Sequence, residues 1–199
     1  MKPRATFISI CLASTAAAVG LTVSPVAYAA GAAAPPAAKS APAERGRYLV
    51  NAAGCHDCHT PLKMGANGPE PDMSRMLSGH PERLVMPPAP RLPDGPWLVT
   101  SAATNTAWAG PWGVSYSANL TPDGETGLGR WTERQFVDTI RSGRHLGVGR
   151  AILPPMPIAA YRQFSDADLR AIYAHLRTLP AVSNRVPGPS APVVAATSK

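Results

Sequence analysis

Two cysteines and two histidines stand within five residues, in the order Cys-His-Asp-Cys-His from Cys55 to His59. The sequence has one other cysteine, Cys11, which lies in an apolar stretch near the N-terminus. A disulfide between cysteines three positions apart closes a very short loop and adds little stability by the loop-entropy argument. The pair therefore calls for another chemistry, and that chemistry constrains what can fold around it.

The pattern C-x-x-C-H is the attachment signature of haem c. Two thiols at this spacing, at the end of a helix, can each add to one of the two vinyl groups on a haem edge. The next residue, His59, then projects under the ring as the proximal iron ligand. We therefore predict one haem c, bound covalently through Cys55 and Cys58, and treat His56 and Asp57 as spacers.

Two alternatives compete for the same segment. A structural zinc site needs four N or S ligands, and the sequence offers no second cysteine pair. Its completion by His80, His145 or His175 has no supporting spacing. A thioredoxin-like dithiol needs a strand–helix context, which the surrounding sequence does not indicate.

The sixth iron ligand is predicted to be Met156, because a thioether is a soft donor that favours ferrous iron. Met156 stands in Leu-Pro-Pro-Met-Pro, where prolines on both sides restrict the backbone and can present the sulfur at a fixed place. An isolated methionine more often fills a core. We therefore expect the other methionines to fill the core: Met64, Met73, Met76 and Met86. His80 and His145 stay as alternative sixth ligands.

The N-terminus reads as a cleaved signal peptide, residues 1–29. Lys2 and Arg4 precede an uncharged apolar run, Phe7 to Val23, and the small-residue site Ala-Tyr-Ala follows at 27–29. The alternative is an uncleaved membrane anchor, for which the run is at the short limit. A cleaved signal predicts a periplasmic protein, and no second apolar span follows to cross the membrane.

Composition predicts the remaining boundaries. An Ala/Pro-rich linker is expected over residues 30–42, a single haem-binding domain over 43–181 and a disordered Pro/Ser-rich tail over 182–199. With the signal removed, 17 basic and 12 acidic residues remain, and the basic ones form no dense run. Nucleic acid is therefore a poor expectation, and mild steering of an acidic redox partner is a better one.

Three helices are predicted. The first covers about residues 43–53. The second follows Thr132 and ends at Gly143. Thr132 and Gln135 are spaced to form a capping box at its start. The third follows Ser165 and stops before Pro180, with apolar residues at i, i+3, i+4 and i+7.

Residues 61–118 show no helical or strand periodicity and carry four of the six Met, 10 of the 23 Pro and six of the 17 Gly. We expect a long irregular loop there, with a short helical turn near 74–77 and no strand. The predicted fold class is therefore all-α.

Several of these features occur in one order: a helix, the C-x-x-C-H motif, Asn-Leu-Thr-Pro at 119–122, Trp131 before a capped helix, the Pro-Pro-Met-Pro loop and Leu-Arg-Ala-Ile-Tyr at 169–173. This order resembles class I cytochrome c over residues 43–181. The resemblance is to monohaem cytochromes and cytochrome subunits that serve bacterial periplasmic or membrane-bound dehydrogenases.

The resemblance implies electron transfer on a six-coordinate haem, with a dehydrogenase as donor and an oxidase or another cytochrome as acceptor. It implies that Gly46 and Tyr48 let the first helix cross the last near Tyr173. It also supports Met156 as distal ligand. It places the Asn119–Thr121 stretch and Trp131 near the haem edge, although ordinary turn and core roles explain them equally well.

The chain departs from the family pattern in two respects. It has a single C-x-x-C-H motif, whereas subunits of the large dehydrogenases often carry two or three, and its 61–118 segment is longer than in a minimal cytochrome c. The expected role is that of an electron carrier and not an enzyme. The alternatives are a fixed cytochrome subunit of a dehydrogenase complex and a haem enzyme or gas sensor with an open sixth position.

Overall fold

The computed structural model describes residues 40–93 and 95–191. The predicted signal peptide and the linker up to residue 39 lie outside these residues, as does the tail beyond 191. The helices and strands are, in chain order, α1 (Ala41–Ala52), α2 (Cys55–His59), β1 (Leu62–Gly65), β2 (Gly68–Pro71), η1 (Met73–Arg75), β3 (Thr100–Ser101), β4 (Ala107–Gly110), β5 (Gly113–Tyr116), α3 (Glu133–Ser142), η2 (His145–Gly147), α4 (Ile158–Tyr161) and α5 (Asp166–Leu176).

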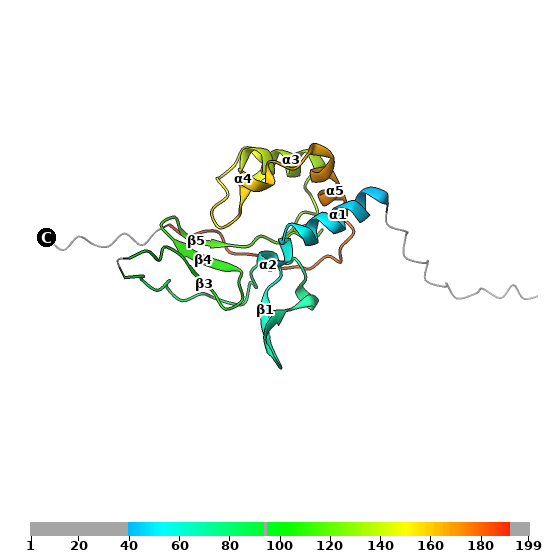
Figure 1. Ribbon diagram of the computed structural model, residues 1–199. Coiled ribbons are helices and arrows are strands. Elements are labelled where there is room, and N and C mark those ends of the chain that lie inside the picture. Colours follow the sequence, from blue (N-terminus) through cyan, green and yellow to red (C-terminus); the bar gives the residue numbers. More distant parts are fainter. Residues whose placement is uncertain (1–39, 94, 192–199) are drawn as a thin grey trace, which may run out of the picture. The chain divides into compact units, whose positions relative to one another are not determined.

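Helices α1, α3 and α5 form the core of the domain. In Figure 1 they gather with α4 above α2, while the strands lie below α2 and to its left. Most of the buried apolar side chains of the core cluster come from these three helices and from two loops: Leu49 and Val50; Phe136, Val137 and Ile140; Leu169, Ile172 and Leu176; Leu77 and Leu128. Burial of such side chains is the main favourable contribution to the stability of a domain of this size.

Helix α1 crosses α5 at Gly46. A Cβ atom at this position would lie 1.8 Å from the carbonyl oxygen of Ala171, so only glycine permits this approach of the two backbones. The expected contribution of Tyr48 to the crossing is wrong, since its side chain is 60% exposed and lies beneath the Arg45 guanidinium. The crossing therefore depends on Gly46.

Helix α3 begins and ends where its capping residues predict. Thr132 accepts a hydrogen bond from the Gln135 backbone, and the Gln135 side chain accepts one from the Thr132 backbone. Gly143 closes the helix with a φ of 68°, a left-handed conformation that favours glycine. The start of α5 after Ser165 is confirmed in the same way.

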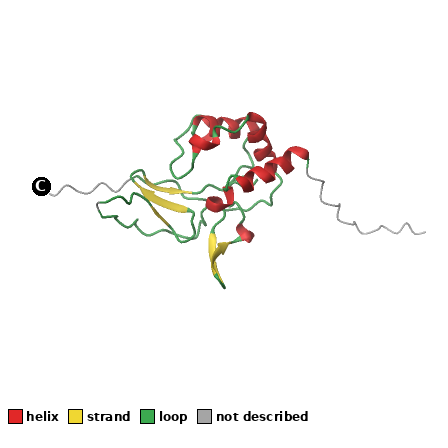
Figure 2. Cartoon of the chain, viewed as in Figure 1, coloured by secondary structure: helices red, strands yellow, loops and turns green. Residues whose placement is uncertain are grey.

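The prediction of an all-α fold is wrong. In the described residues, five short strands form two antiparallel sheets, and all five lie in the segment that was expected to be an irregular loop. Strands β1 and β2 form a hairpin that pairs Leu62 with Pro71, and the second sheet has the order β3-β4-β5. Figure 2 shows these strands apart from the helices. The expected helical turn near 74–77 corresponds to η1.

The strands were not predicted because each is only two to four residues long, and because the residues of β1 and β2 are mostly partly or fully exposed. Strand β2 reads Gly-Pro-Glu-Pro with three exposed residues out of four, so it lacks the apolar–polar alternation of a half-buried strand. Proline and glycine are also depleted in strands generally. In β4 and β5 the ladder pairs Ala107 with Tyr116, where packing against the rest of the domain overrides weak propensity.

Residues 182–190 are folded, which corrects the expected tail for that stretch. Asn184 is fully buried, and its side-chain amide donates to the carbonyl oxygens of Ser78 and His80. Its Oδ1 accepts from Arg75 and from the Glu82 backbone. These four bonds bind the C-terminal segment to the loop after η1.

No helix in the described ranges is both long and apolar enough to cross a bilayer.

Candidate functional site

The C-x-x-C-H motif forms the short helix α2, directly after α1. Gly54 separates the two helices with a φ of 67°, which turns the chain sharply and favours glycine. A Cβ atom at Gly54 would also lie 2.8 Å from the Asp57 carboxylate. The two cysteines form no disulfide.

A cavity of about 410 Å³ lies against this helix, and Cys55, Cys58 and His59 all line it. Its other walls come from β4 and β5, the loop 117–131, helices α3 and α5, and the segment 185–189. The lining is mainly apolar, including Trp108, Leu128, Phe136, Ile140, Leu153 and Ile172. A mostly apolar, partly enclosed space is the usual form of a cofactor site.

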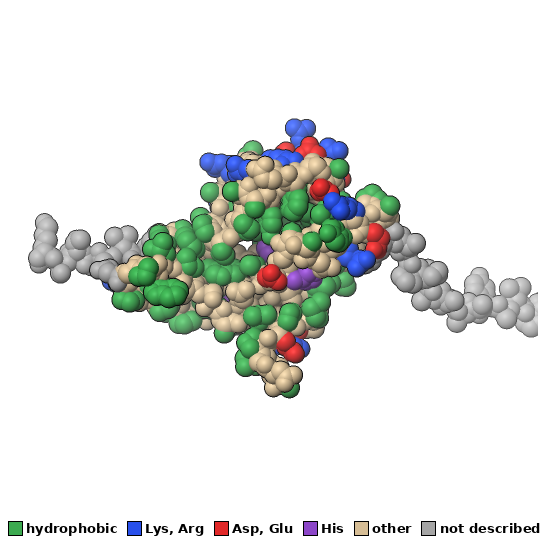
Figure 3. Space-filling view, viewed as in Figure 1, with side chains coloured by type: hydrophobic (Ala, Val, Ile, Leu, Met, Phe, Trp, Pro, Cys, Tyr) green, Lys and Arg blue, Asp and Glu red, His purple; other side chains and the backbone are tan. Residues whose placement is uncertain are grey.

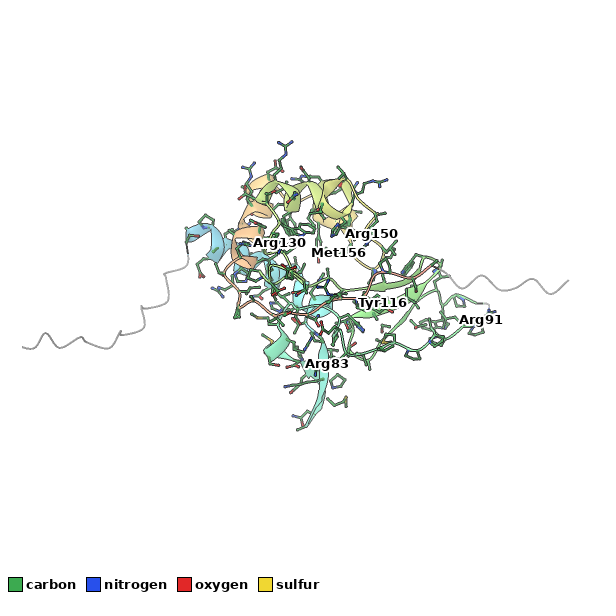
Figure 4. The ribbon with its side chains drawn as sticks, turned by 180° about the vertical axis from the view of Figure 1, so that it is seen from behind. Arg83, Arg91, Tyr116, Arg130, Arg150 and Met156 are labelled. Carbon is green, nitrogen blue, oxygen red and sulfur yellow. The ribbon has the colours of Figure 1, made fainter. Side chains whose placement is uncertain are left out.

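Met156 lines the same cavity and is the one described methionine that does so. In Figure 4 it reaches from the loop before α4 toward β5, where Tyr116 lies. Met64 and Met73 are exposed on the surface instead. The structure therefore brings together all four residues that the sequence singled out.

His59 is 8% exposed and is oriented by one hydrogen bond, from Nδ1 to the carbonyl oxygen of Ala118 at 2.8 Å. A carbonyl can only accept, so Nδ1 carries the proton and the lone pair resides on Nε2. No described residue hydrogen-bonds to Nε2. Burial lowers the pKa of His59, which favours the neutral ring that metal coordination requires.

The two thiols are protonated at neutral pH. Burial raises the pKa of Cys55 to about 11, and the charges of Asp57 and Cys58 act in the same direction. Burial, followed by Asp57, also raises the pKa of Cys58. A redox-active Cys-x-x-Cys pair needs a lowered pKa, so the environment argues against the dithiol alternative.

The zinc alternative lacks a ligand set. In the described part of the chain, no cluster of three or more His, Cys, Asp or Glu side chains could hold a metal ion. His80 is fully buried away from the cavity, between the Thr106 hydroxyl and the Leu84 carbonyl. His175 is buried in α5, beside Gly46.

His145 alone among the alternative sixth ligands lies at the cavity. It stands in η2, where its ring meets the edge of Trp131 at a centroid distance of 5.0 Å. Burial, followed by the charge of Arg150, lowers its pKa.

Asn119 and Trp131 lie at the cavity and also take part in the packing around it. Asn119 and Trp131 line the cavity. The Asn119 side chain also accepts from the Thr121 backbone and donates to the Val182 carbonyl, so it stabilises the turn and connects it to the C-terminal segment. The Tyr173 hydroxyl fixes Trp131 by donating to its carbonyl oxygen at 2.6 Å.

Sequence reasoning missed the residues that hold α2 from outside. The Ser117 hydroxyl donates to the Cys58 carbonyl, and the Asn105 side chain donates to the Asp57 carbonyl at 2.8 Å. The Tyr161 hydroxyl donates to the Ala53 carbonyl at 2.6 Å, just before the motif. Each contact joins residues at least 48 positions apart, and a polar residue in a loop carries no signal of such a partner.

Comparison with known proteins shows that the chain is similar to cytochrome subunits of bacterial dehydrogenases. It is 31% identical over 134 residues to the fructose dehydrogenase cytochrome subunit of Gluconobacter japonicus. The aligned region covers 67% of this chain and 20% of that protein. The chain is 41% identical over 64 residues to the cytochrome c subunit of the quinone alcohol dehydrogenase of Gluconobacter oxydans, covering 32% and 13%.

A third relative is the gluconate 2-dehydrogenase cytochrome c subunit of Pantoea cypripedii, 39% identical over 67 residues, covering 34% of this chain and 15% of that protein. The chain thus spans a fifth or less of the length of these relatives. No family model matches the sequence. These similarities to cytochrome subunits of dehydrogenases agree with the resemblance of the sequence to class I cytochrome c.

Proposed function

We propose that this protein is the cytochrome subunit of a bacterial dehydrogenase and passes electrons on one covalently bound haem c. The observation that carries the proposal is the shared cavity, which Cys55, Cys58 and His59 line together with Met156. The relatives support the subunit role, because the three described above are all cytochrome subunits of dehydrogenases.

The residues present fit the group. Two protonated thiols on one short helix match the two vinyl positions, and a buried neutral histidine with a free Nε2 lone pair matches a proximal ligand. The Met156 thioether supplies the distal ligand. When bound, haem supplies reversible one-electron chemistry between ferrous and ferric iron.

The chain's own residues orient the site and exclude water. The Ala118 carbonyl holds the His59 ring, while Ser117 and Asn105 hold the backbone of α2. The apolar walls lower the local dielectric, which together with the axial ligands sets the reduction potential. With His59 and Met156 as its two ligands, haem iron would have no position left for a substrate, so the proposed role is electron transfer.

Covalent attachment is tested by the protein matured in a host that attaches haem c. We expect haem staining of the denatured protein on a gel, an intact mass with one haem, and loss of both in a Cys55→Ser, Cys58→Ser variant. Cys11→Ser, at the third cysteine, is the matched control and should leave the stain unchanged. A wild-type protein without covalent haem, or a double variant that keeps it, contradicts the proposal.

Two measurements separate the alternatives. A fixed subunit in the periplasm should co-purify with dehydrogenase activity after mild extraction, whereas a free shuttle should elute alone. A haem enzyme or gas sensor should bind carbon monoxide readily in the ferrous state, which a six-coordinate carrier resists.

A further inference from the structure

The segment from Arg83 to Val99 concentrates the exposed apolar surface of the molecule. Ten large apolar side chains are exposed in the described residues, and six of them lie here: Leu84, Val85, Leu92, Trp97, Leu98 and Val99. Val85 is 85% exposed, Trp97 74% and Leu98 64%. Large apolar residues that cluster on a surface, and are not scattered singly, mark an interaction site.

The backbone of this segment rules out an added strand as its mode of interaction. Between Leu84 and Thr100 the described residues make no backbone hydrogen bond with one another or with the rest of the described chain. Five prolines interrupt the segment, at 87, 88, 90, 93 and 96, and remove N–H donors that pairing with a partner strand would need. Fewer N–H donors also lower the cost of bringing the backbone against an apolar phase.

Two arginines supply the positive charge of the segment. Arg83 and Arg91 form no ion pair with a described carboxylate, and the segment contains no Lys or Glu and a single Asp, Asp94. Figure 3 shows the apolar surface over β3–β5, with the acidic side chains in view lying elsewhere. Figure 4, seen from behind, shows Arg83 and Arg91 well apart, Arg83 near the β1–β2 hairpin and Arg91 toward the far end of the β3–β5 region.

The shape of the surface distinguishes between two kinds of partner. Trp97, Leu98 and Val85 lie outside the cavity beside the cysteine motif, and most of the surface of each is exposed to solvent. A folded protein partner would need pockets that match each protruding side chain, whereas the boundary between lipid headgroups and acyl chains adapts to them. Tryptophan favours that boundary, and arginine extends from it to phosphate.

We propose that the 83–99 segment docks on an anionic phospholipid bilayer, with Trp97 and Leu98 in the headgroup–acyl boundary and Arg83 and Arg91 at the phosphates. Strand β3 follows the segment directly and pairs with β4, which forms part of the cavity wall. Docking therefore holds the cavity wall close to the membrane. The proposal is independent of the dehydrogenase role, because it concerns lipid alone.

The test is co-sedimentation of the full haem-loaded protein with vesicles of phosphatidylcholine that contain increasing phosphatidylglycerol. Bound protein should increase with phosphatidylglycerol and decrease with salt. Trp97→Ser with Leu98→Ser should weaken binding about tenfold or more. Arg83→Gln with Arg91→Gln should weaken binding to the anionic vesicles by roughly tenfold or more and leave binding to pure phosphatidylcholine unchanged.

Two valines provide a matched control, because Val85 is 85% exposed and Val148, in the loop after η2, is 84% exposed. Val85→Asp should weaken vesicle binding, and Val148→Asp should not. The proposal is overturned if no vesicle composition binds the protein, or if Val148→Asp acts as strongly as Val85→Asp. Unchanged vesicle binding with loss of a co-purifying dehydrogenase in the Trp97 and Leu98 variant would assign the surface to a protein partner instead. Haem staining tests covalent haem attachment in a separate measurement, so failure of the lipid proposal is distinguishable from failure of the electron-transfer proposal.

Discussion

The helices and the strand-bearing segment of this protein support the same motif in different ways. Helices α1, α3 and α5 pack through buried apolar faces, and α1 approaches α5 closely enough that Gly46 meets the Ala171 carbonyl. The 62–118 segment contributes strands of two to four residues, of which β1 and β2 are largely exposed. It supports α2 through single hydrogen bonds: Asn105 and Ser117 donate to backbone carbonyls of the motif, and the Ala118 carbonyl accepts from His59. The difference indicates that the helices provide the stability of the domain, whereas the segment provides the orientation of its site.

The largest loss of stability is expected at the helix crossing. Gly46→Ala should lower the free energy of unfolding by about 3 kcal/mol or more, since the new Cβ forces the two helices apart. Denaturant unfolding followed by helical circular dichroism measures the change. Gly124→Ala, where a Cβ meets nothing within 4 Å, is the control and should change stability by less than about 1 kcal/mol. Equal losses in the two variants would remove the central role of the crossing.

A smaller loss is expected where the two regions are joined. Asn184→Ala deletes four hydrogen bonds at a fully buried position and should cost roughly 2 kcal/mol. It should also make residues 182–190 sensitive to proteolysis under native conditions. The neighbouring Ser183→Ala, at a position that is not buried, should leave both properties unchanged. A stable, protease-resistant Asn184→Ala variant would mean that the C-terminal segment is held by other contacts.

The smallest effect is expected in the β1–β2 hairpin. Met64 is 76% exposed, so Met64→Ala should change the free energy of unfolding by no more than about 0.5 kcal/mol. A loss above about 1 kcal/mol in thermal or denaturant unfolding would mean that the hairpin contributes to the core, and the contrast between the two regions would then fail.

The same contrast explains what the sequence could predict. The helices were predictable because capping residues such as Thr132 and Gly143 and a 3.6-residue apolar period are local signals. The strands are too short to show a clear apolar–polar alternation, so the all-α prediction was wrong for the 62–116 stretch. The burial of Asn184 was also not predicted. The Pro/Ser-rich composition around it indicates disorder, and composition carries no information on the distant residues that Asn184 binds.

The site divides in the same way. The cysteine pair, His59 and a Met156 flanked by prolines could be singled out from local pattern, and the structure brings them to one cavity. Their roles as haem and iron ligands remain predictions. The contacts from Ser117, Asn105 and Tyr161 could not be foreseen, since each depends on where a distant chain segment lies.

The central claim is that His59 and Met156 hold one haem iron between them. The absorption spectrum of the ferric protein tests it most directly, because a methionine sulfur on ferric iron gives a charge-transfer band. The wild-type protein and Met64→Ala should show this band. Met156→Ala should lack it, have a lower reduction potential and bind carbon monoxide when reduced. A Met156→Ala protein with the band and the potential of the wild type would contradict the account and move the sixth ligand to another residue.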